Sequence, residues 1–182
     1  MNYSDDGRTA DAALPFFAGE TAMNGNEIRI AVISDSHGWL RRCVVRELRD
    51  CSHILHAGDI IHESDLDELA TYGQLFAVRG NNDRWMQGVR DLAGYLRFQI
   101  GGVRFLMVHD RMDAPRDLKG IDVVVYGHSH RYSEETKDGC LWLNPGSCGR
   151  ARFGGDVTMA KIILRDGRMK EVNRIDFDPD EE

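Results

Sequence analysis

Residues 28–38 read IRIAVISDSHG, a run of apolar and β-branched residues that ends abruptly in Ser, Asp, Ser, His and Gly. The apolar part, residues 28–33, is predicted to be a buried strand. The segments that follow predict a helix over 40–48, a strand over 53–57, a helix from a Ser64 cap to about Tyr72, and a strand over 74–78. This alternation predicts a βαβαβ unit, in which crossover helices join parallel strands.

The second half of the sequence predicts a largely antiparallel arrangement. Gly101-Gly102 and Asp166-Gly167 each separate two apolar runs, which is the pattern of a β-hairpin. Further strands are predicted over residues 122–126, 131–136 and 140–143. We therefore expect a mixed α/β (α+β) fold in which two β-sheets pack together and helices lie outside them.

The chain of 182 residues is long enough for one domain with a substantial core. Residues 1–26 lack periodicity, and we expect them to form a poorly ordered N-terminal extension. Residues 27–176 are predicted to form the domain, and residues 177–182 an acidic C-terminal tail.

The composition, with 42% hydrophobic and 29% charged residues, is ordinary for a soluble globular protein. We expect a cytoplasmic protein, because the sequence has neither a membrane-spanning apolar run nor the features of a signal peptide. The four cysteines lack CxxC spacing and are predicted to be reduced thiols. The net charge of -7 argues against binding of long nucleic acid, although it allows a small phosphorylated substrate held by local positive charge.

Polar side chains follow five of the apolar runs, at the point where each run ends. They are Asp35 and His37, Asp59, Asn81, His109, and His128 and His130. Ligands of α/β sheets bind beyond the carboxyl ends of the strands, so these side chains are expected to converge. The Asp-x-His and His-x-His pairs have the spacing that points two side chains to one side of an extended chain.

This set of seven donor residues predicts a metal site. Imidazole, carboxylate and amide oxygen suit Mn, Fe, Zn, Co or Ni. Seven donors exceed the needs of one tetrahedral ion but suit two ions that share a carboxylate. Two divalent ions, two Asp and a bridging hydroxide carry a net charge of about +1, which would attract a phosphate ester, and the hydroxide would be its nucleophile. A single strand-end His or Gly-Asp is usually structural, but the combination favours metal-dependent phosphoester hydrolysis.

The order D-x-H, G-D, G-N-x-D, a lone His and G-H-x-H resembles the calcineurin-like metallophosphoesterase superfamily, and most closely its small single-domain phosphodiesterases of bacteria and archaea. The resemblance runs from Ile28 to about Gly149 and includes an N-P-G-S segment at residues 144–147. It implies a four-layer α-β-β-α sandwich. It also implies two divalent ions, with Mn first and Fe, Zn, Ni, Co or Mg as alternatives, and a possible homo-oligomer.

The resemblance assigns each donor residue to an ion. One ion would be held by Asp35, His37 and His130, the other by Asn81, His109 and His128, and Asp59 would bridge them. Asp83 takes the acidic place that ends the G-N-x-D motif and would orient a ligand.

Asn82 departs from the pattern of the larger family members, which have a His here that helps the leaving group depart. A carboxamide cannot give up a proton, although it can donate a hydrogen bond to a phosphoryl oxygen. We therefore expect a preference for phosphodiesters or activated esters, with His62 as the alternative acid. A second departure is Asp110-Arg111, where related small phosphodiesterases have Gly and then His. Asp110 would tune metal affinity or point outward, and Arg111 would contact the scissile phosphate or be a solvated charge.

Three functions are compatible with these residues. The leading one is a divalent-metal phosphodiesterase that acts on a small phosphoester. The second keeps the metals but acts on a phosphomonoester or a nucleotide. The third is a non-catalytic protein-binding scaffold, the use that a retromer subunit makes of a similar sequence; the presence of all seven donors argues against it.

Overall fold

The computed structural model describes residues 27–150 and 156–180. The predicted N-terminal extension, residues 1–26, and the end of the acidic tail, residues 181–182, lie outside the described residues. At the start of the predicted tail, the last strand runs to Phe177, and the carbonyl of Pro179 accepts a hydrogen bond from Nη1 of Arg41 at 2.9 Å. This end of the described chain is therefore attached to the domain.

The first sheet joins the βαβαβ unit to the last hairpin, in the order β10-β9-β1-β2-β3. Its strands are β1 (Ile28–Ile33), β2 (His53–His56), β3 (Gln74–Ala77), β9 (Val157–Arg165) and β10 (Arg168–Phe177). Strands β1, β2 and β3 are parallel as predicted, whereas β9 is antiparallel to both β1 and β10.

The second sheet has the order β4-β5-β6-β8-β7. Its strands are β4 (Tyr95–Ile100), β5 (Val103–Val108), β6 (Val123–Val125), β7 (Tyr132–Lys137) and β8 (Cys140–Pro145). The hairpins β4/β5 and β7/β8 are antiparallel as predicted. However, β6 lies between β5 and β8 and is parallel to both. Both sheets are therefore mixed, and the second half is less antiparallel than the sequence suggested.

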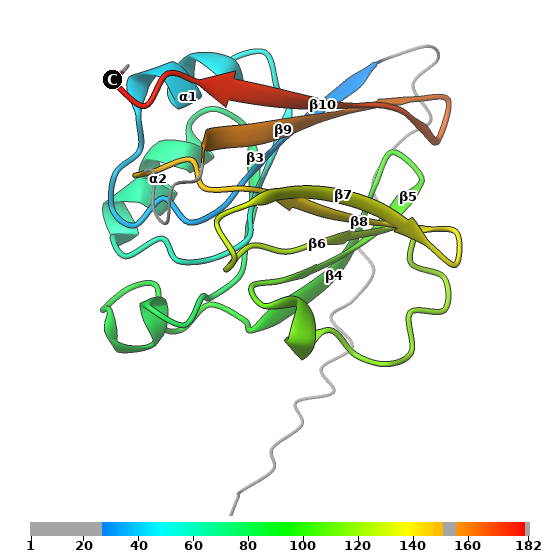
Figure 1. Ribbon diagram of the computed structural model, residues 1–182, viewed down its shortest axis with the longest axis horizontal. Helices are drawn as coiled ribbons and strands as arrows, with labels where there is room; N and C mark the ends of the chain where they lie inside the picture. The colour runs from blue at the N-terminus through cyan, green and yellow to red at the C-terminus, as the bar shows by residue number, and fades with distance from the viewer. Residues whose placement is uncertain (1–26, 151–155, 181–182) are drawn as a thin grey trace, which may run out of the picture.

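The two sheets stack face to face around the main core (Figure 1). Val32 and Leu55 of the first sheet and Phe105 and Val125 of the second are fully buried in it. The rings of Phe76, Phe98 and Phe105 continue from one sheet into the other, with stacked centroids 4.2 Å and 5.4 Å apart. Burial of this apolar surface is the main term that holds the layers together.

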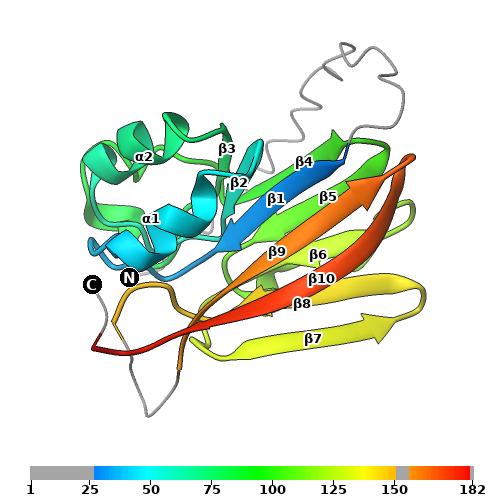
Figure 2. The ribbon, with the colours of Figure 1, turned by 90° about the horizontal axis from the view of Figure 1, so that it is seen from above.

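Both α-helices cover the outer face of the first sheet, where α1 (Arg42–Leu48) packs its Val44 and Leu48 against Ile33 and Ile54 (Figure 2). The second helix, α2, spans Glu63–Ala70. The predicted Ser64 cap is wrong: His62 is the N-cap residue, and no side chain caps this helix. The turn before it is instead held by a buried carboxylate described below. The four cysteines are buried and make no disulfide, as predicted.

The outer face of the second sheet is covered by a loop. Its apolar side chains pack against Leu106 and Val124, and its one short helix in the described chain is a 3-10 turn, η2 (Arg111–Asp113). The segment contains Pro115 and Gly120, which disfavour a helix interior, and the described residues form no α-helix where a four-layer sandwich would place one. Neither α-helix of the described residues has the length and apolar character needed to cross a membrane.

The two glycine turns lie against each other. A Cβ added at Gly102, between β4 and β5, would lie 3.2 Å from Cα of Gly167, between β9 and β10. These turns therefore contact each other within one chain, and self-association stays a prediction.

Candidate metal centre

The seven donor residues converge at one end of the two sheets, as predicted. Each follows the carboxyl end of a parallel strand, so the loops meet where the strands end. Asp35 and His37 follow β1, Asp59 follows β2, Asn81 follows β3, His109 follows β5, and His128 and His130 follow β6.

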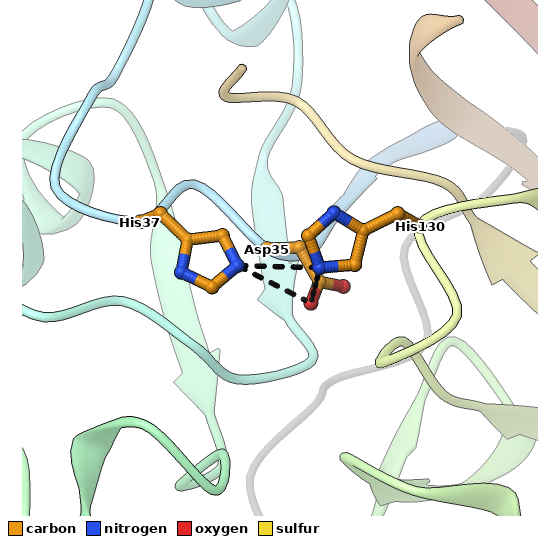
Figure 3. A group of neighbouring side chains, drawn as sticks. All are labelled: Asp35, His37 and His130. Atoms are coloured by element: carbon orange, nitrogen blue, oxygen red, sulfur yellow. Dashed lines mark hydrogen bonds and ion pairs between the residues drawn. The ribbon is translucent and has the colours of Figure 1, made fainter. Parts of the chain in front are cut away.

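Asp35, His37 and His130 form the first group (Figure 3). Nε2 of His130 lies 3.2 Å from Oδ1 of Asp35 and 3.2 Å from Nε2 of His37. Oδ1 of Asp35 and Nε2 of His37 are 3.9 Å apart. Three potential ligand atoms therefore face one point.

Asn81, His109 and His128 form the second group. Oδ1 of Asn81 lies 3.0 Å from Nε2 of His109 and 3.0 Å from Nδ1 of His128. Asp59 lies between the groups, with its Oδ2 3.7 Å from Nε2 of His37 and 3.4 Å from Nε2 of His109. This is the division that the family resemblance implied.

The backbone at these donors is unusual. Asp35, His37, Asp59, His128 and His130 have positive φ angles between 49° and 68°. Non-glycine residues seldom adopt this left-handed conformation, and those that do cluster at functional sites. The paired side chains thus converge through tight turns, and the extended chain expected from their period-2 spacing is wrong.

Asp83 holds the turn that carries Asp59. It is fully buried, and its carboxylate accepts hydrogen bonds from four backbone N–H groups: those of Asp59, Ile60, Ile61 and Gly80, at 2.8–2.9 Å. A carboxylate that accepts several backbone N–H groups makes strong, charge-assisted bonds. Asp83 thereby orients Asp59 through the backbone.

Asn82 is directed at Asp59. Its backbone N–H donates to Oδ1 of Asp59 at 2.8 Å, and its Nδ2 donates to Oδ2 at 2.6 Å. Next to it, Gly80 leaves no room for a side chain, because an added Cβ would lie 2.1 Å from Oδ1 of Asp59. The carboxamide therefore orients a donor residue in this structure, whereas the sequence predicted a contact with substrate.

The chemistry of the inward-facing atoms fits divalent metal ions. Oδ1 of Asp35 is buried and accepts no hydrogen bond from the described residues, whereas its Oδ2 accepts from Oγ of Ser34 and from the N–H of His128. Nδ1 of His109 lies 2.7 Å from the carbonyl of Ala57, which can only accept, so Nδ1 carries a proton and the lone pair of the neutral ring is at Nε2, which faces the cluster. Such outer hydrogen bonds are typical of metal-binding carboxylates and histidines.

The electrostatics of the cluster favour a cation. Burial opposes ionisation of Asp59, but the hydrogen bond and charge of His109 and the donors of Asn82 outweigh it and hold the pKa of Asp59 below its usual range. Burial likewise acts against the charged form of His109, but Asp59 and Asp35 outweigh it and raise the pKa of His109 to about 9. The carboxylates thus create the negative potential that a bound cation needs.

The N-P-G-S segment supports the loops from behind. Nδ2 of Asn144 donates to the carbonyl of Gly127 at 2.7 Å and to Oγ of Ser129 at 3.0 Å, which ties down the turn that carries His128 and His130. Oγ of Ser147 donates to the carbonyl of Asp35 at 2.9 Å. The sequence marked this segment only by resemblance and assigned it no role.

A cavity of about 380 Å³ opens beside the second group. Asn81, His109, Asp110 and His128 line one side of it, and Arg79, Arg84, Tyr95 and Asp113 also line it. Neither Arg79 nor Arg84 was predicted from the sequence, although the two residues flank the Gly-Asn-Asn-Asp motif.

Arg111 lies elsewhere. Its guanidinium carbon is 5.5 Å from the ring centroids of both Tyr126 and Trp142, and its Nη2 is 3.8 Å from Oε2 of Glu135. It does not line the cavity, so the predicted contact with the scissile phosphate has no support in this geometry. His62 is exposed, and its ring lies beside Gly38, next to His37.

A family model described as "Calcineurin-like phosphoesterase superfamily domain" matches residues 28–167. The chain belongs to this superfamily. It is 29% identical over 162 residues to a probable metallophosphoesterase of Mycoplasma pneumoniae, a match that covers 79% of this chain and 94% of the relative. A phosphodiesterase of Methanocaldococcus jannaschii is 24% identical over 140 residues, which cover 66% of this chain and 84% of the relative.

The solved structures confirm the fold. The structure of Vacuolar Protein Sorting 29 from Cryptosporidium parvum matches with a TM-score of 0.66 at 19% identity, over 83% of this chain and 98% of that one. At this identity the likeness concerns the fold alone. Membership of the superfamily supports metal-dependent phosphoester hydrolysis as the activity of the chain.

Replacing Asp83 with Asn should destabilise the protein. One oxygen becomes an NH₂ group that faces backbone donors, so two of the four N–H groups lose their acceptor. At about 1.5–3 kcal/mol for each bond to a charged group, we expect the free energy of unfolding to fall by about 3 kcal/mol or more. Urea denaturation of the metal-free protein measures this. Asp67→Asn, an exposed change on α2, is the control; equal losses in both variants would contradict the role of Asp83.

His56 should make stability depend on pH. It is fully buried, with Nδ1 accepting from the N–H of Gly58 and Nε2 3.0 Å from Oγ of Ser36, and burial lowers its pKa to about 4. The unfolded chain binds this proton near pH 6.5, so the stabilisation is present above pH 6.5 and is lost as the pH falls toward 4. From pH 7 to pH 4 this group should cost the native state roughly 3 kcal/mol.

The comparison of wild type with His56→Gln isolates this contribution from those of the other titrating groups. The free energy of unfolding of both proteins is measured from pH 7 to pH 4, and the wild type should show the steeper decline. Parallel curves for the two proteins would rule out His56 as the source of the pH dependence.

Proposed function

We propose that this protein is a phosphodiesterase that hydrolyses small phosphodiesters at a dinuclear centre, with Mn²⁺ as the preferred ion. The observation that carries the proposal is the division of six donor residues into two groups of three, with Asp59, the seventh, between them. One group would hold each ion, and Asp59 would contribute to both. The relative named a phosphodiesterase supports the same reaction class.

The residues of the chain would place both ions and the substrate. Two divalent ions, when bound, would supply positive charge to a phosphoryl group and lower the pKa of a coordinated water. Two residues keep Asp59 between the groups. Asp83 accepts a hydrogen bond from the backbone N–H of Asp59, and Asn82 donates hydrogen bonds to its carboxylate. The buried histidines His37, His109 and His130 make one wall of the centre rigid.

Asn82 favours a diester substrate. In a phosphodiester with a good leaving group, that group departs without receiving a proton. An alkyl monoester needs a general acid to protonate its leaving group, and this help is worth about 10²–10⁴-fold. A carboxamide cannot supply that proton. Its hydrogen bonds to Asp59 give it a positioning role instead.

Arg79 and Arg84 are the candidate contacts for the substrate. Nη1 of Arg79 donates to the carbonyl of Arg90 at 2.8 Å, which pre-positions its guanidinium. Arg84 makes no hydrogen bond or ion pair with any residue of the described ranges, so its guanidinium is available to a phosphoryl oxygen. Guanidinium groups match phosphate oxygens in charge and geometry.

A protein-binding scaffold is the competing proposal. The similarity to Vacuolar Protein Sorting 29 concerns the fold and says nothing about activity here. The complete donor set and the adjoining cavity favour an enzyme. The two proposals differ in a direct test of catalysis.

The first test compares hydrolysis of bis-p-nitrophenyl phosphate with that of p-nitrophenyl phosphate. Metal-stripped protein should be inactive and should recover on addition of Mn²⁺, with the diester as the better substrate. Asp59→Ala should lose more than about 100-fold in kcat/KM, because even outer-shell changes at metal sites cost about 10–100-fold.

Each other outcome has a distinct meaning. Preference for p-nitrophenyl phosphate would contradict the diester assignment. Equal or better turnover of a simple alkyl phosphate would contradict the inference from Asn82 and point to His62 as the acid. Protein that binds no metal and cleaves neither ester would favour the scaffold.

A second test concerns the cavity. Arg84→Gln should raise KM for bis-p-nitrophenyl phosphate about fivefold, the equivalent of about 1 kcal/mol for one exposed charge-assisted contact, with little change in kcat. Arg111→Gln is the matched control and should leave KM unchanged, because Arg111 lies outside the cavity. The reverse result would restore Arg111 as the phosphate contact.

A further inference from the structure

His128 differs from the other three histidines of the centre in its exposure. Its side chain is 50% exposed, whereas those of His37, His109 and His130 are 5–7% exposed. Its ring contacts the ring of His109 edge-on, with centroids 5.2 Å apart, but burial does not enclose it. Something other than burial has to orient it.

The ring of His128 lies between two groups. On one side, its Nδ1 is 3.0 Å from Oδ1 of Asn81 and so faces the second donor group. On the other side, its Nε2 is 3.7 Å from Oδ2 of Asp110. That distance is too long for a hydrogen bond but close enough for an electrostatic contact.

Asp110 is itself held in place. Its Oδ1 accepts a hydrogen bond from the N–H of Met112 at 2.9 Å, which caps η2. It also directly follows His109, a donor of the same group. One carboxylate oxygen is thus anchored to the backbone while the other faces His128.

We propose that Asp110 is a positioning residue that holds His128 with Nδ1 toward the second ion and strengthens the binding of that ion. The inference rests on the dinuclear centre proposed above. A histidine that ligates through Nδ1 carries its proton on Nε2, and Oδ2 of Asp110 lies on that side. A carboxylate behind the ring favours this tautomer and raises the basicity of the ligating nitrogen.

The chain provides a matched pair of variants. Asp110→Asn keeps the shape and the oxygen that caps η2 but removes the charge beside His128. Asp113→Asn removes the same charge from another residue that lines the same cavity. A simple effect of charge in the cavity would lower the metal affinity of both variants equally, whereas a positioning effect would lower only that of Asp110→Asn.

The decisive measurement is titration calorimetry of the metal-stripped full chain with Mn²⁺. Wild type should bind two ions. Asp110→Asn should lower the affinity for the ion at the second donor group by about 10–100-fold and change the affinity for the other ion by no more than about twofold. Asp113→Asn should bind both ions as wild type does. Long-range ¹H–¹⁵N spectra of the proteins loaded with Zn²⁺, which is diamagnetic, should show the Nε2–H tautomer of His128 in wild type and a mixture in Asp110→Asn.

The outcomes separate this inference from the proposed function. Two ions in wild type with unchanged affinity in Asp110→Asn would overturn the role of Asp110 alone. Equal losses in both variants would also overturn it, in favour of a general charge effect. A single ion in wild type would overturn the dinuclear centre itself. Urea denaturation of the metal-free proteins should be the same for wild type and Asp110→Asn; a lower stability of the variant would assign Asp110 to the cap of η2.

Discussion

The centre depends on one buried carboxylate. Asp83 gathers four backbone N–H groups, three from the turn after β2 and one from the turn after β3. Without it, these N–H groups would be buried with no acceptor, which is costly in a site of low dielectric constant. Because Asp59 sits in that turn, the position of the residue between the two donor groups follows from a single side chain.

The strained backbone has the same origin. A positive φ at Asp59 lasts only where the surrounding contacts determine the conformation, and Asp83 supplies those contacts. The loop after β6 is held in a comparable way by Asn144, and Asp35 receives a hydrogen bond from the N–H of His128. The loops after β1, β2 and β6 are thus each held by a polar side chain of another segment, and their donor atoms are left facing inward.

The two sides of the centre differ in their exposure to solvent. The side that contains Asp35, His37 and His130 is nearly closed to solvent, whereas the side that contains Asn81 and His128 opens into the cavity with Arg79 and Arg84. A substrate would reach the centre from the open side. The open side also carries Asp110, which differs from the pattern of the small phosphodiesterases that the sequence resembles, so metal affinity would be adjusted there.

The sequence by itself determined the order of strands and helices and which seven polar residues converge at the strand ends. Apolar runs that end in Asp, His or Asn are visible without a structure, because burial and strand geometry impose a local pattern. The sequence did not predict the parallel pairing of β6, because a short buried run pairs equally well in either direction.

Only the tertiary structure decided which polar residues act together. Arg79 and Arg84 line the cavity, whereas Arg111, placed there by the sequence, lies over Tyr126 and Trp142. Asn82 faces Asp59, and Asp110 faces His128, through contacts between residues 23 and 18 positions apart. The direction of a side chain on a loop depends on where the rest of the chain brings its partners, and that is a property of the folded molecule.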